Sequence, residues 1–199
     1  MLKRKLYSQL ASWKASEKRK AFCIIGARQI GKTTLVREFA RNNYEYFAEI
    51  NFITDLKASD IFQQTFDAET IITNLTAYLR QPLEAGKTLI FFDEIQKCPQ
   101  VRTAIKFLVE DGRFDYVESG SLLGVNFQDV PSFPVGFEEI HEMYPMDFEE
   151  FAAANGVQQE TFSYLYDCSC NRKPVSESVH NTMKKLFYTY IVVGGMPEA

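Results

Sequence analysis

Apolar and polar residues follow one another along the chain in patterns that predict five strands. Two short runs, residues 21–25 and 89–92, are apolar throughout, which is typical of strands covered on both faces of a sheet. Residues 44–52 instead place apolar side chains at every second position, the period of a half-buried strand. Two further strands are predicted at residues 114–118 and 139–144.

Segments between and after these strands carry apolar residues three and four positions apart, which predicts helices. The N-terminus does so through Leu2, Leu6 and Leu10 and predicts an amphipathic helix, with a basic transit peptide as the alternative. Asp147 followed by Glu150 has the spacing of a capping box. The other predicted segments are helices at residues 32–41, 58–66, 68–80, a stretch opened by Pro99, 147–154, 158–166 and 178–191, and a surface loop at residues 126–136.

Strands that alternate with helices predict an α/β fold with a mainly parallel central sheet flanked by helices. The 199 residues suffice for one globular domain and the start of a second. We therefore expect a domain over residues 1–155 that includes the N-terminal helix. Residues 156–199 are expected to form a helical extension, the start of a truncated lid or second domain.

The first predicted strand leads into a segment that fits the phosphate-loop pattern G-x-x-x-x-G-K-[ST]. Glycines permit a backbone that turns its amides inward, and the following helix directs its N-terminal dipole at the same anion. Lys32 is expected to reach the β- and γ-phosphate oxygens, and Thr33 to offer its hydroxyl to Mg²⁺. A surface turn is the alternative, but it leaves a lysine and a threonine at the helix start unexplained. The predicted nucleotide-binding residues are Gly26, Ala27, Arg28, Gln29, Ile30, Gly31, Lys32, Thr33 and Thr34.

Two acids follow the apolar run at residues 89–92. An acid at the end of a buried strand beside the phosphate-loop strand can hold Mg²⁺, directly or through water, and Asp93 fits that role. Glu94 can orient and deprotonate an attacking water. Lys32 and Glu94 are therefore the candidate catalytic residues, and Thr33 and Asp93 the candidate metal ligands. Two solvated acids at a strand end are the alternative.

Two serines, Ser119 and Ser121, follow the fourth predicted strand. A polar side chain at this place can contact the γ-phosphate or the attacking water. A helix cap for the residues after Gly120 is an equally open interpretation. Both serines are kept as candidate nucleotide-binding residues.

The acidic pair also indicates the reaction. The sequence holds no Asn-Lys-x-Asp guanine-recognition pattern, and a small-molecule kinase has less need of a second acid. ATP with Mg²⁺ is therefore the expected ligand, and hydrolysis to ADP and phosphate the expected reaction.

Charge is unevenly distributed. Residues 1–50 hold 11 Lys and Arg against 4 Asp and Glu, whereas the remaining residues hold 11 against 22. Residues 114–171 contain no Lys or Arg and 11 Asp and Glu, a balance that repels nucleic-acid backbones. Nucleic acid is therefore not expected as a partner, and the basic N-terminal segment is interpreted as a solvated helix face. That segment contains Lys3, Arg4, Lys5, Lys14, Lys18, Arg19 and Lys20.

No run approaches the roughly 20 apolar residues that a membrane-spanning helix needs, so no membrane association is expected. The four cysteines are Cys23, Cys98, Cys168 and Cys170, and their spacing with His180 matches no zinc motif. Reduced thiols and a cytoplasmic location are the expectation.

These motifs together resemble a family of prokaryotic AAA-type ATPases in which the ATPase domain is followed by a C-terminal domain of unknown function. The resemblance extends over the whole chain and implies an AAA-type P-loop core that takes ATP with Mg²⁺. It also implies that the chain is incomplete, since members of the family continue beyond its last residues. The segments that carry the resemblance are residues 26–35, Phe92-Asp93-Glu94-Ile95-Gln96, Ser119-Gly120-Ser121, Pro134-Val135-Gly136, residues 144–151 and Gly194-Gly195-Met196-Pro197-Glu198.

One departure from the family bears on turnover. AAA-type ATPases commonly complete the site with an arginine from a neighbouring subunit, yet no Lys or Arg lies between Arg113 and Arg172. Loss of such an arginine costs roughly 10³–10⁵ in rate in other P-loop enzymes, so binding of ATP–Mg²⁺ with slow hydrolysis is expected.

Three hypotheses of function remain. The first is an ATPase that drives conformational change in an attached domain or partner. The second is a nucleotide-gated interaction module, with a protein partner or self-association. The third, ranked last for its charge, is a nucleic-acid-dependent ATPase.

Overall fold

The computed structural model describes residues 4–17, 19–63, 65–121 and 134–197. They form two compact units, one of residues Gln9–Met143 and one of residues Met1–Ser8 and Tyr144–Ala199. We refer to them as the sheet unit and the helical unit. The domain boundary proposed at residue 155 stays a prediction.

The sheet unit is built on five strands, all of them parallel. Their order in the sheet is β2-β3-β4-β1-β5, so the two strands with continuous apolar runs, β1 and β3, flank β4. This confirms the predicted α/β fold with a parallel sheet. The strands are β1 Ala21–Gly26, β2 Tyr46–Asn51, β3 Thr88–Asp93, β4 Asp115–Ser121 and β5 Glu138–Met143.

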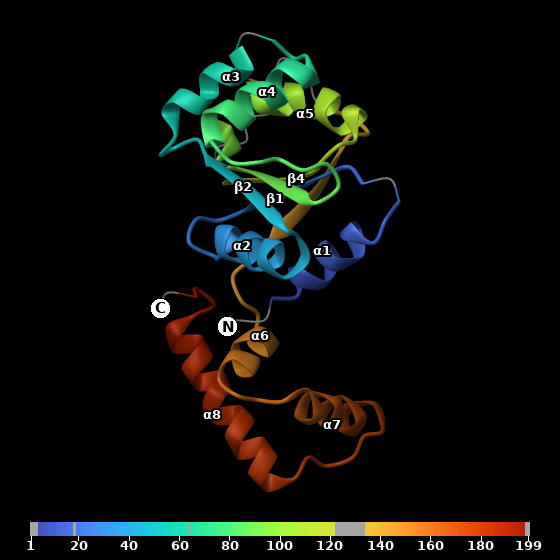
Figure 1. Ribbon diagram of the computed structural model, residues 1–199. Coiled ribbons are helices and arrows are strands. Elements are labelled where there is room, and N and C mark those ends of the chain that lie inside the picture. The colour runs from blue at the N-terminus through green and yellow to red at the C-terminus, as the bar shows by residue number, and fades with distance from the viewer. Residues whose placement is uncertain (1–3, 18, 64, 122–133, 198–199) are drawn as a thin grey trace. The chain divides into compact units, whose positions relative to one another are not determined.

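Helices cover both faces of the sheet, as the continuous apolar runs of β1 and β3 require (Figure 1). On one face α2 and the second half of α1 pack through Trp13, whose ring lies 5.6 Å from Phe22 and 6.4 Å from Phe39. On the other face α3, α4 and α5 share a core with Ile50, Ile90 and Phe92. Helix α1, Leu6–Lys14, belongs to this unit from Gln9 onward. The other helical segments of this unit are α2 Lys32–Asn43, η1 Leu56–Ser59, α3 Asp60–Gln63, α4 Ala68–Leu79, η2 Ile95–Lys97 and α5 Gln100–Asp111.

Three elements differ from their sequence predictions. Helix α1 starts at Leu6 and extends to Lys14, because Trp13 in its last turn is buried. The helix predicted at residues 58–66 is short, because Asp67 accepts a hydrogen bond from the Thr70 amide and caps α4 instead. Strand β4 runs on to Ser121 through its pairing with β1. Leu2 and most of the predicted loop at residues 126–136 lie outside the described residues.

The helical unit contains α6 Phe148–Ala154, α7 Gln159–Cys170 and α8 Glu177–Val193. The predicted capping box is confirmed: the Asp147 carboxylate accepts from the Glu150 amide, and the Glu150 carboxylate accepts from the Asp147 amide. Tyr190 packs on Phe151 with ring centroids 5.3 Å apart, and its hydroxyl donates to the Met146 carbonyl.

Two motif segments meet in this unit. The Met146 amide donates to the Gly195 carbonyl at 2.7 Å, so residues 144–147 lie against residues 194–197. A Cβ on Gly195 would collide with the Met146 backbone, which explains why a glycine is needed there. None of the helices in the part of the chain that the structure describes is long and apolar enough to cross a membrane.

Candidate functional site

The loop after β1 has the backbone that the phosphate-loop pattern predicts. Gly31 has φ 91° and Gln29 has φ 62°, the left-handed region that glycine adopts at least cost. A Cβ at Gly26 would meet the Met143 carbonyl of the neighbouring strand and the Ile30 side chain. Ile30 is fully buried and anchors the loop, whereas Ala27, Arg28, Gln29 and Thr34 are exposed.

Helix α2 begins at the end of this loop. Gly31 is its N-cap and offers no side chain, so the first-turn amides have no capping partner from it. Those amides and the helix dipole form an anion-binding end. The Lys32 ammonium is buried and donates to the Gly26 and Ala27 carbonyls at 3.1 and 2.6 Å. Burial lowers the pKa of Lys32, while Glu94 and Asp93 oppose the shift.

Asp93 is buried at the carboxyl end of β3, and four donors surround its carboxylate. Thr33 Oγ1 and Asn51 Nδ2 each donate to Oδ2 at 2.9 Å. The Glu94 amide donates to Oδ1 at 3.1 Å, and so does the Ser119 hydroxyl. The structure therefore brings Thr33, Asp93 and Ser119 together, as their positions at one edge of a parallel sheet predict.

Ser119 and Ser121 lie within β4, so the sequence-based boundary that placed them after the strand is wrong. Both are buried, and Ser121 pairs in register with Gly26 at the start of the loop. The Ser119 hydroxyl is a hydrogen-bond donor to Asp93 rather than a helix cap. A nucleotide contact by either serine stays a prediction.

Glu94 lies one residue beyond the sheet edge, with φ 59° and ψ 45°. Its carboxylate Oε2 accepts a hydrogen bond from Gln96 Nε2. Sequence reasoning assigned no role to Gln96 or Asn51. A polar residue at the end of a strand beside β3 was the available signal for Asn51, but it required the strand order.

The carboxylate oxygens of Asp93 and the hydroxyl oxygen of Thr33 fit Mg²⁺, which prefers hard oxygen ligands. Thr33 uses its proton toward Asp93, which leaves oxygen lone pairs of the hydroxyl free for a cation. Thr33 and Asp93 are thus the residues that would hold the ion, directly or through water.

A second polar cluster is buried under α5, away from the loop. Cys23, Glu118 and Glu138 bring their ligand atoms within 4.8 Å of one another, a set that could hold a metal ion. The Arg102 guanidinium lies 2.6 Å from Glu138 and already supplies a positive charge. Burial and the Glu138 carboxylate raise the pKa of Glu118 well above its ordinary value, and burial first of all raises that of Cys23. We interpret the cluster as an ion pair beside a neutral acid.

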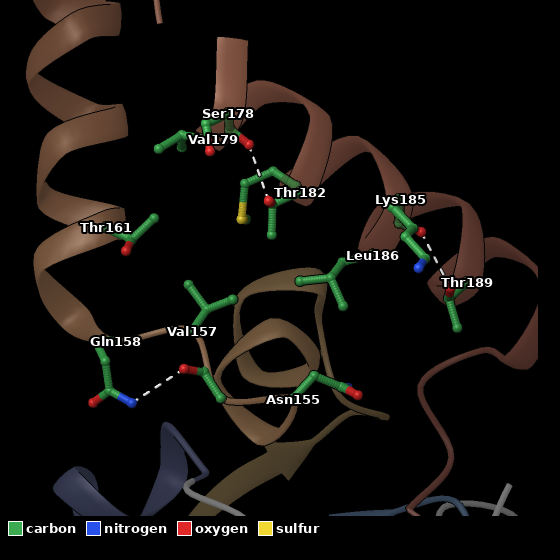
Figure 2. A pocket seen from close by; sticks show the side chains of 12 residues that line it. Asn155, Val157, Gln158, Thr161, Ser178, Val179, Thr182, Lys185, Leu186 and Thr189 are labelled. Carbon is green, nitrogen blue, oxygen red and sulfur yellow. Dashed lines mark hydrogen bonds between the residues drawn. The ribbon is translucent and has the colours of Figure 1, made fainter. Parts of the chain in front are cut away.

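A cleft of about 600 Å³ lies in the helical unit, between the α6–α7 connection, α7 and α8. Val157 and Leu186 point into it, and Thr161 faces them from α7 (Figure 2). Its lining holds one charged residue, Lys185, and no acid. The acids Asp93 and Glu94 lie at the end of β3 beside the phosphate loop instead.

The basic N-terminal segment is partly neutralised within each unit. In the helical unit Arg4 lies 3.3 Å from Glu150 and Lys5 lies 2.7 Å from Asp147. In the sheet unit Arg19 lies 2.6 Å from Asp115, Lys20 lies 3.8 Å from Glu139, and Lys14 donates to the Asn43 carbonyl. Lys3 and Lys18 lie outside the described residues.

Comparisons with known proteins agree with this architecture. A model of a family described as AAA domain matches residues 18–152, more than half of the chain. The comparison with curated proteins found no match.

Solved structures with a similar fold include RuvB from Thermotoga maritima, with a TM-score of 0.48 and 21% identity over 75% of this chain and 46% of that chain. The Aeropyrum pernix ORC1 protein in complex with DNA has a TM-score of 0.46 and 18% identity over 75% of this chain and 46% of that chain. Drosophila ORC bound to DNA has a TM-score of 0.50 and 14% identity over 94% of this chain and 55% of that chain. The chain thus spans about half the length of these structures, and identities this low show the fold alone.

One expectation from charge is wrong. Nucleic acid was not expected as a partner, yet the fold is similar to that in Drosophila ORC bound to DNA. An acidic balance over part of a chain with this fold therefore does not exclude nucleic acid.

Proposed function

This chain belongs to the AAA domain family, and from that premise we propose that it is an ATPase domain that binds ATP with Mg²⁺ and hydrolyses it. Hydrolysis would drive a conformational change in an attached domain or partner. The observation that carries the proposal is the contact of Thr33 Oγ1 with Asp93 Oδ2 at 2.9 Å, which joins the phosphate loop to the acidic pair. Two motifs separated by about 60 residues in sequence thus form one site.

Each residue then has a role that follows from its place. The amides at the start of α2 face the phosphates, and Lys32 exchanges its contacts with loop carbonyls for phosphate oxygens. Bound Mg²⁺ would neutralise charge on the phosphate oxygens. Asp93 holds Thr33 in place, and Glu94 accepts a proton from the attacking water.

Slow turnover by the isolated chain is part of the proposal. No Lys or Arg lies between Arg113 and Arg172 to act as an arginine finger in the segment after β4. We expect a rate below about 1 s⁻¹, the low end of typical enzymes.

The test measures ATP affinity and phosphate release with and without Mg²⁺, for the wild-type chain, Lys32→Ala and Glu94→Gln. Lys32→Ala should weaken ATP binding roughly 10- to 100-fold, the value of a charge-assisted contact worth about 1.5–3 kcal/mol. Glu94→Gln should retain binding and lose about 10²–10⁴ in turnover. Arg41→Gln, at an exposed position of the last turn of α2, is the matched control and should match wild type.

Binding without hydrolysis by any variant would favour the nucleotide-gated interaction module. Absence of binding would exclude the phosphate-loop assignment. Parallel samples with duplex DNA separate a nucleic-acid-dependent ATPase, whose turnover would rise with DNA.

A further inference from the structure

A glutamine lies beside the proposed catalytic base. Gln96 belongs to the η2 turn, Ile95–Lys97, which packs against β4 at the edge of the sheet where the phosphate loop lies. Its Nε2 donates to Glu94 Oε2. Because a carboxylate only accepts hydrogen bonds, the amide orientation is fixed with Nε2 toward Glu94.

The two oxygens of the Glu94 carboxylate are therefore not equivalent. Oε2 is engaged by Gln96, whereas no described residue forms a hydrogen bond with Oε1. The Glu94 amide is also fixed, since it donates to Asp93 Oδ1 at 3.1 Å. One hydrogen bond at the Glu94 amide and one at its carboxylate thus determine the direction of the side chain.

The backbone at this place supports the same view. Glu94 has φ 59°, which non-glycine residues adopt rarely and keep where their surroundings demand it. This conformation ends β3 and starts the turn that returns Gln96 toward Glu94. Gln96 Oε1 is buried and has no hydrogen-bond partner among the described residues, a cost that the hydrogen bond to Glu94 must offset.

We propose that Gln96 is a positioning residue for ATP hydrolysis, which orients Glu94 so that Oε1 accepts the proton of the attacking water. This inference rests on the proposed function. The water oxygen forms a bond to the γ-phosphorus, and the bond from that phosphorus to the β–γ bridging oxygen breaks, its electron pair leaving with ADP. One water proton passes to Glu94 Oε1 and then to phosphate or solvent, while the other stays on the phosphate formed.

Asn51 provides a contrast within the same site. It donates to Asp93, the candidate metal ligand, and so acts on the cation side of the site. Gln96 donates to the candidate base, and its side chain forms no other hydrogen bond among the described residues. Loss of Gln96 should therefore change the rate of the chemical step and not the affinity for nucleotide.

The experiment is a double-mutant cycle on the full chain with Gln96→Leu, Glu94→Gln and the double variant. Single-turnover phosphate release, ATP affinity and melting temperature are measured for each. Gln96→Leu should lower the rate on the order of 10- to 100-fold, as expected for a misdirected catalytic group, with ATP affinity unchanged. In the Glu94→Gln background the same substitution should have no further effect, because Gln96 acts through Glu94. Lys97→Ala, at an exposed position of the same turn, is the control.

A second variant separates positioning from packing. Gln96→Glu keeps a side chain of the same length but replaces the amide donor with a carboxylate, which only accepts hydrogen bonds. A loss of rate as large as that from Gln96→Leu, at an unchanged melting temperature, is expected because the donated hydrogen bond and not packing is required.

Three outcomes would overturn the inference. The first is a Gln96→Leu variant that hydrolyses ATP at the wild-type rate while Glu94→Gln does not, which leaves the proposed function intact. The second is equal losses from Gln96→Leu in both backgrounds, together with a lower melting temperature, which indicates a structural role. The third is absence of phosphate release by the wild-type chain, which removes the hydrolytic function and this inference together.

Discussion

The sheet unit and the helical unit bury their large hydrophobic side chains to very different extents. In the sheet unit Phe22, Phe39 and Phe92 are fully buried. In the helical unit α8 has no buried residue over its 17 positions, and Tyr188 and Val192 are 57% and 86% exposed. The sheet unit is therefore stabilised by a core of its own, whereas the helical unit depends on a few contacts around Tyr190 and Met146.

Because of this difference, the polar groups of the two units constrain function to different extents. In the sheet unit, buried polar groups such as Lys32, Asp93 and Glu118 need partners or a function, because unpaired burial is costly. In the helical unit the polar groups are mostly solvated and place weaker constraints on function. Changes of similar chemistry should therefore have unequal effects in the two units.

The largest expected effect is the loss of a core phenylalanine. Phe92→Ala removes a fully buried ring that lies 5.5 Å from Phe62 and 6.2 Å from Phe52, and should cost about 3–5 kcal/mol of unfolding free energy. Phe187→Ala removes a ring that is 45% exposed and contacts Phe148, and should cost only about 0.5–1.5 kcal/mol.

Urea unfolding followed by tryptophan fluorescence tests this pair. Trp13 is the single tryptophan and is buried in the sheet unit, so its emission reports on that unit. Phe92→Ala should move the fluorescence transition, and Phe187→Ala should move only the circular-dichroism transition. Equal shifts of the fluorescence transition would show that the two units do not differ in this way.

The second effect comes from the buried acid Glu118. Its pKa is raised by burial and by Glu138, so the folded state keeps a proton that the unfolded state releases above a pH of about 4.3. Stability from this group is present below that pH and is lost as the pH rises toward the folded pKa. Glu118→Gln stays neutral throughout, so its advantage over wild type should grow by up to about 1.4 kcal/mol per pH unit.

Urea unfolding at pH 5, 6 and 7 measures this slope. Glu110→Gln changes an exposed acid of α5 and should leave the wild-type pH dependence in place. A Glu118→Gln variant that is less stable at every pH would mean that Glu118 is ionised and paired with Arg102.

Local patterns were sufficient to predict the parallel sheet, the phosphate loop and the edge that carries Asp93. Each depends on residues adjacent in sequence, such as the apolar run before Gly26 and the glycine and lysine that start α2. The roles of Lys32, Thr33 and Glu94 remain predictions, since they concern a nucleotide.

Contacts between distant strands could not be predicted in this way. The partnership of Asn51 with Asp93 requires that β2 lie beside β3, and the pairing of Arg102 with Glu138 requires the position of α5 over β5. The end of β4 was missed for the same reason, because its last residues are strand only through pairing with β1. Register and strand order are set by tertiary packing, which a single sequence does not reveal.

The smallest effect concerns the capping box of the helical unit. Burial raises the pKa of Asp147, but the hydrogen bond from the Glu150 amide and the Lys5 ammonium together outweigh burial. The net pKa therefore lies below the ordinary value. The part of its contribution that depends on charge is therefore present above a pH of about 3.9 and is lost as the pH falls through the folded pKa. Asp147→Ala should cost about 1 kcal/mol at pH 7, the usual value of an N-cap, and less once Asp147 is protonated, because the neutral carboxyl still offers an oxygen to the Glu150 amide.

Asp147→Asn distinguishes the cap from the ion pair, because asparagine keeps an acceptor for the Glu150 amide and loses the charge facing Lys5. Lys5 and Asp147 are both about half exposed, and surface pairs of this kind contribute about 0–1 kcal/mol. We therefore expect Asn to retain most of the stability in circular-dichroism melts of the helices. If Asn is as destabilising as Ala, the ion pair and not the cap holds the start of α6. The helical unit would then depend on its surface charges, in contrast to the sheet unit and its core.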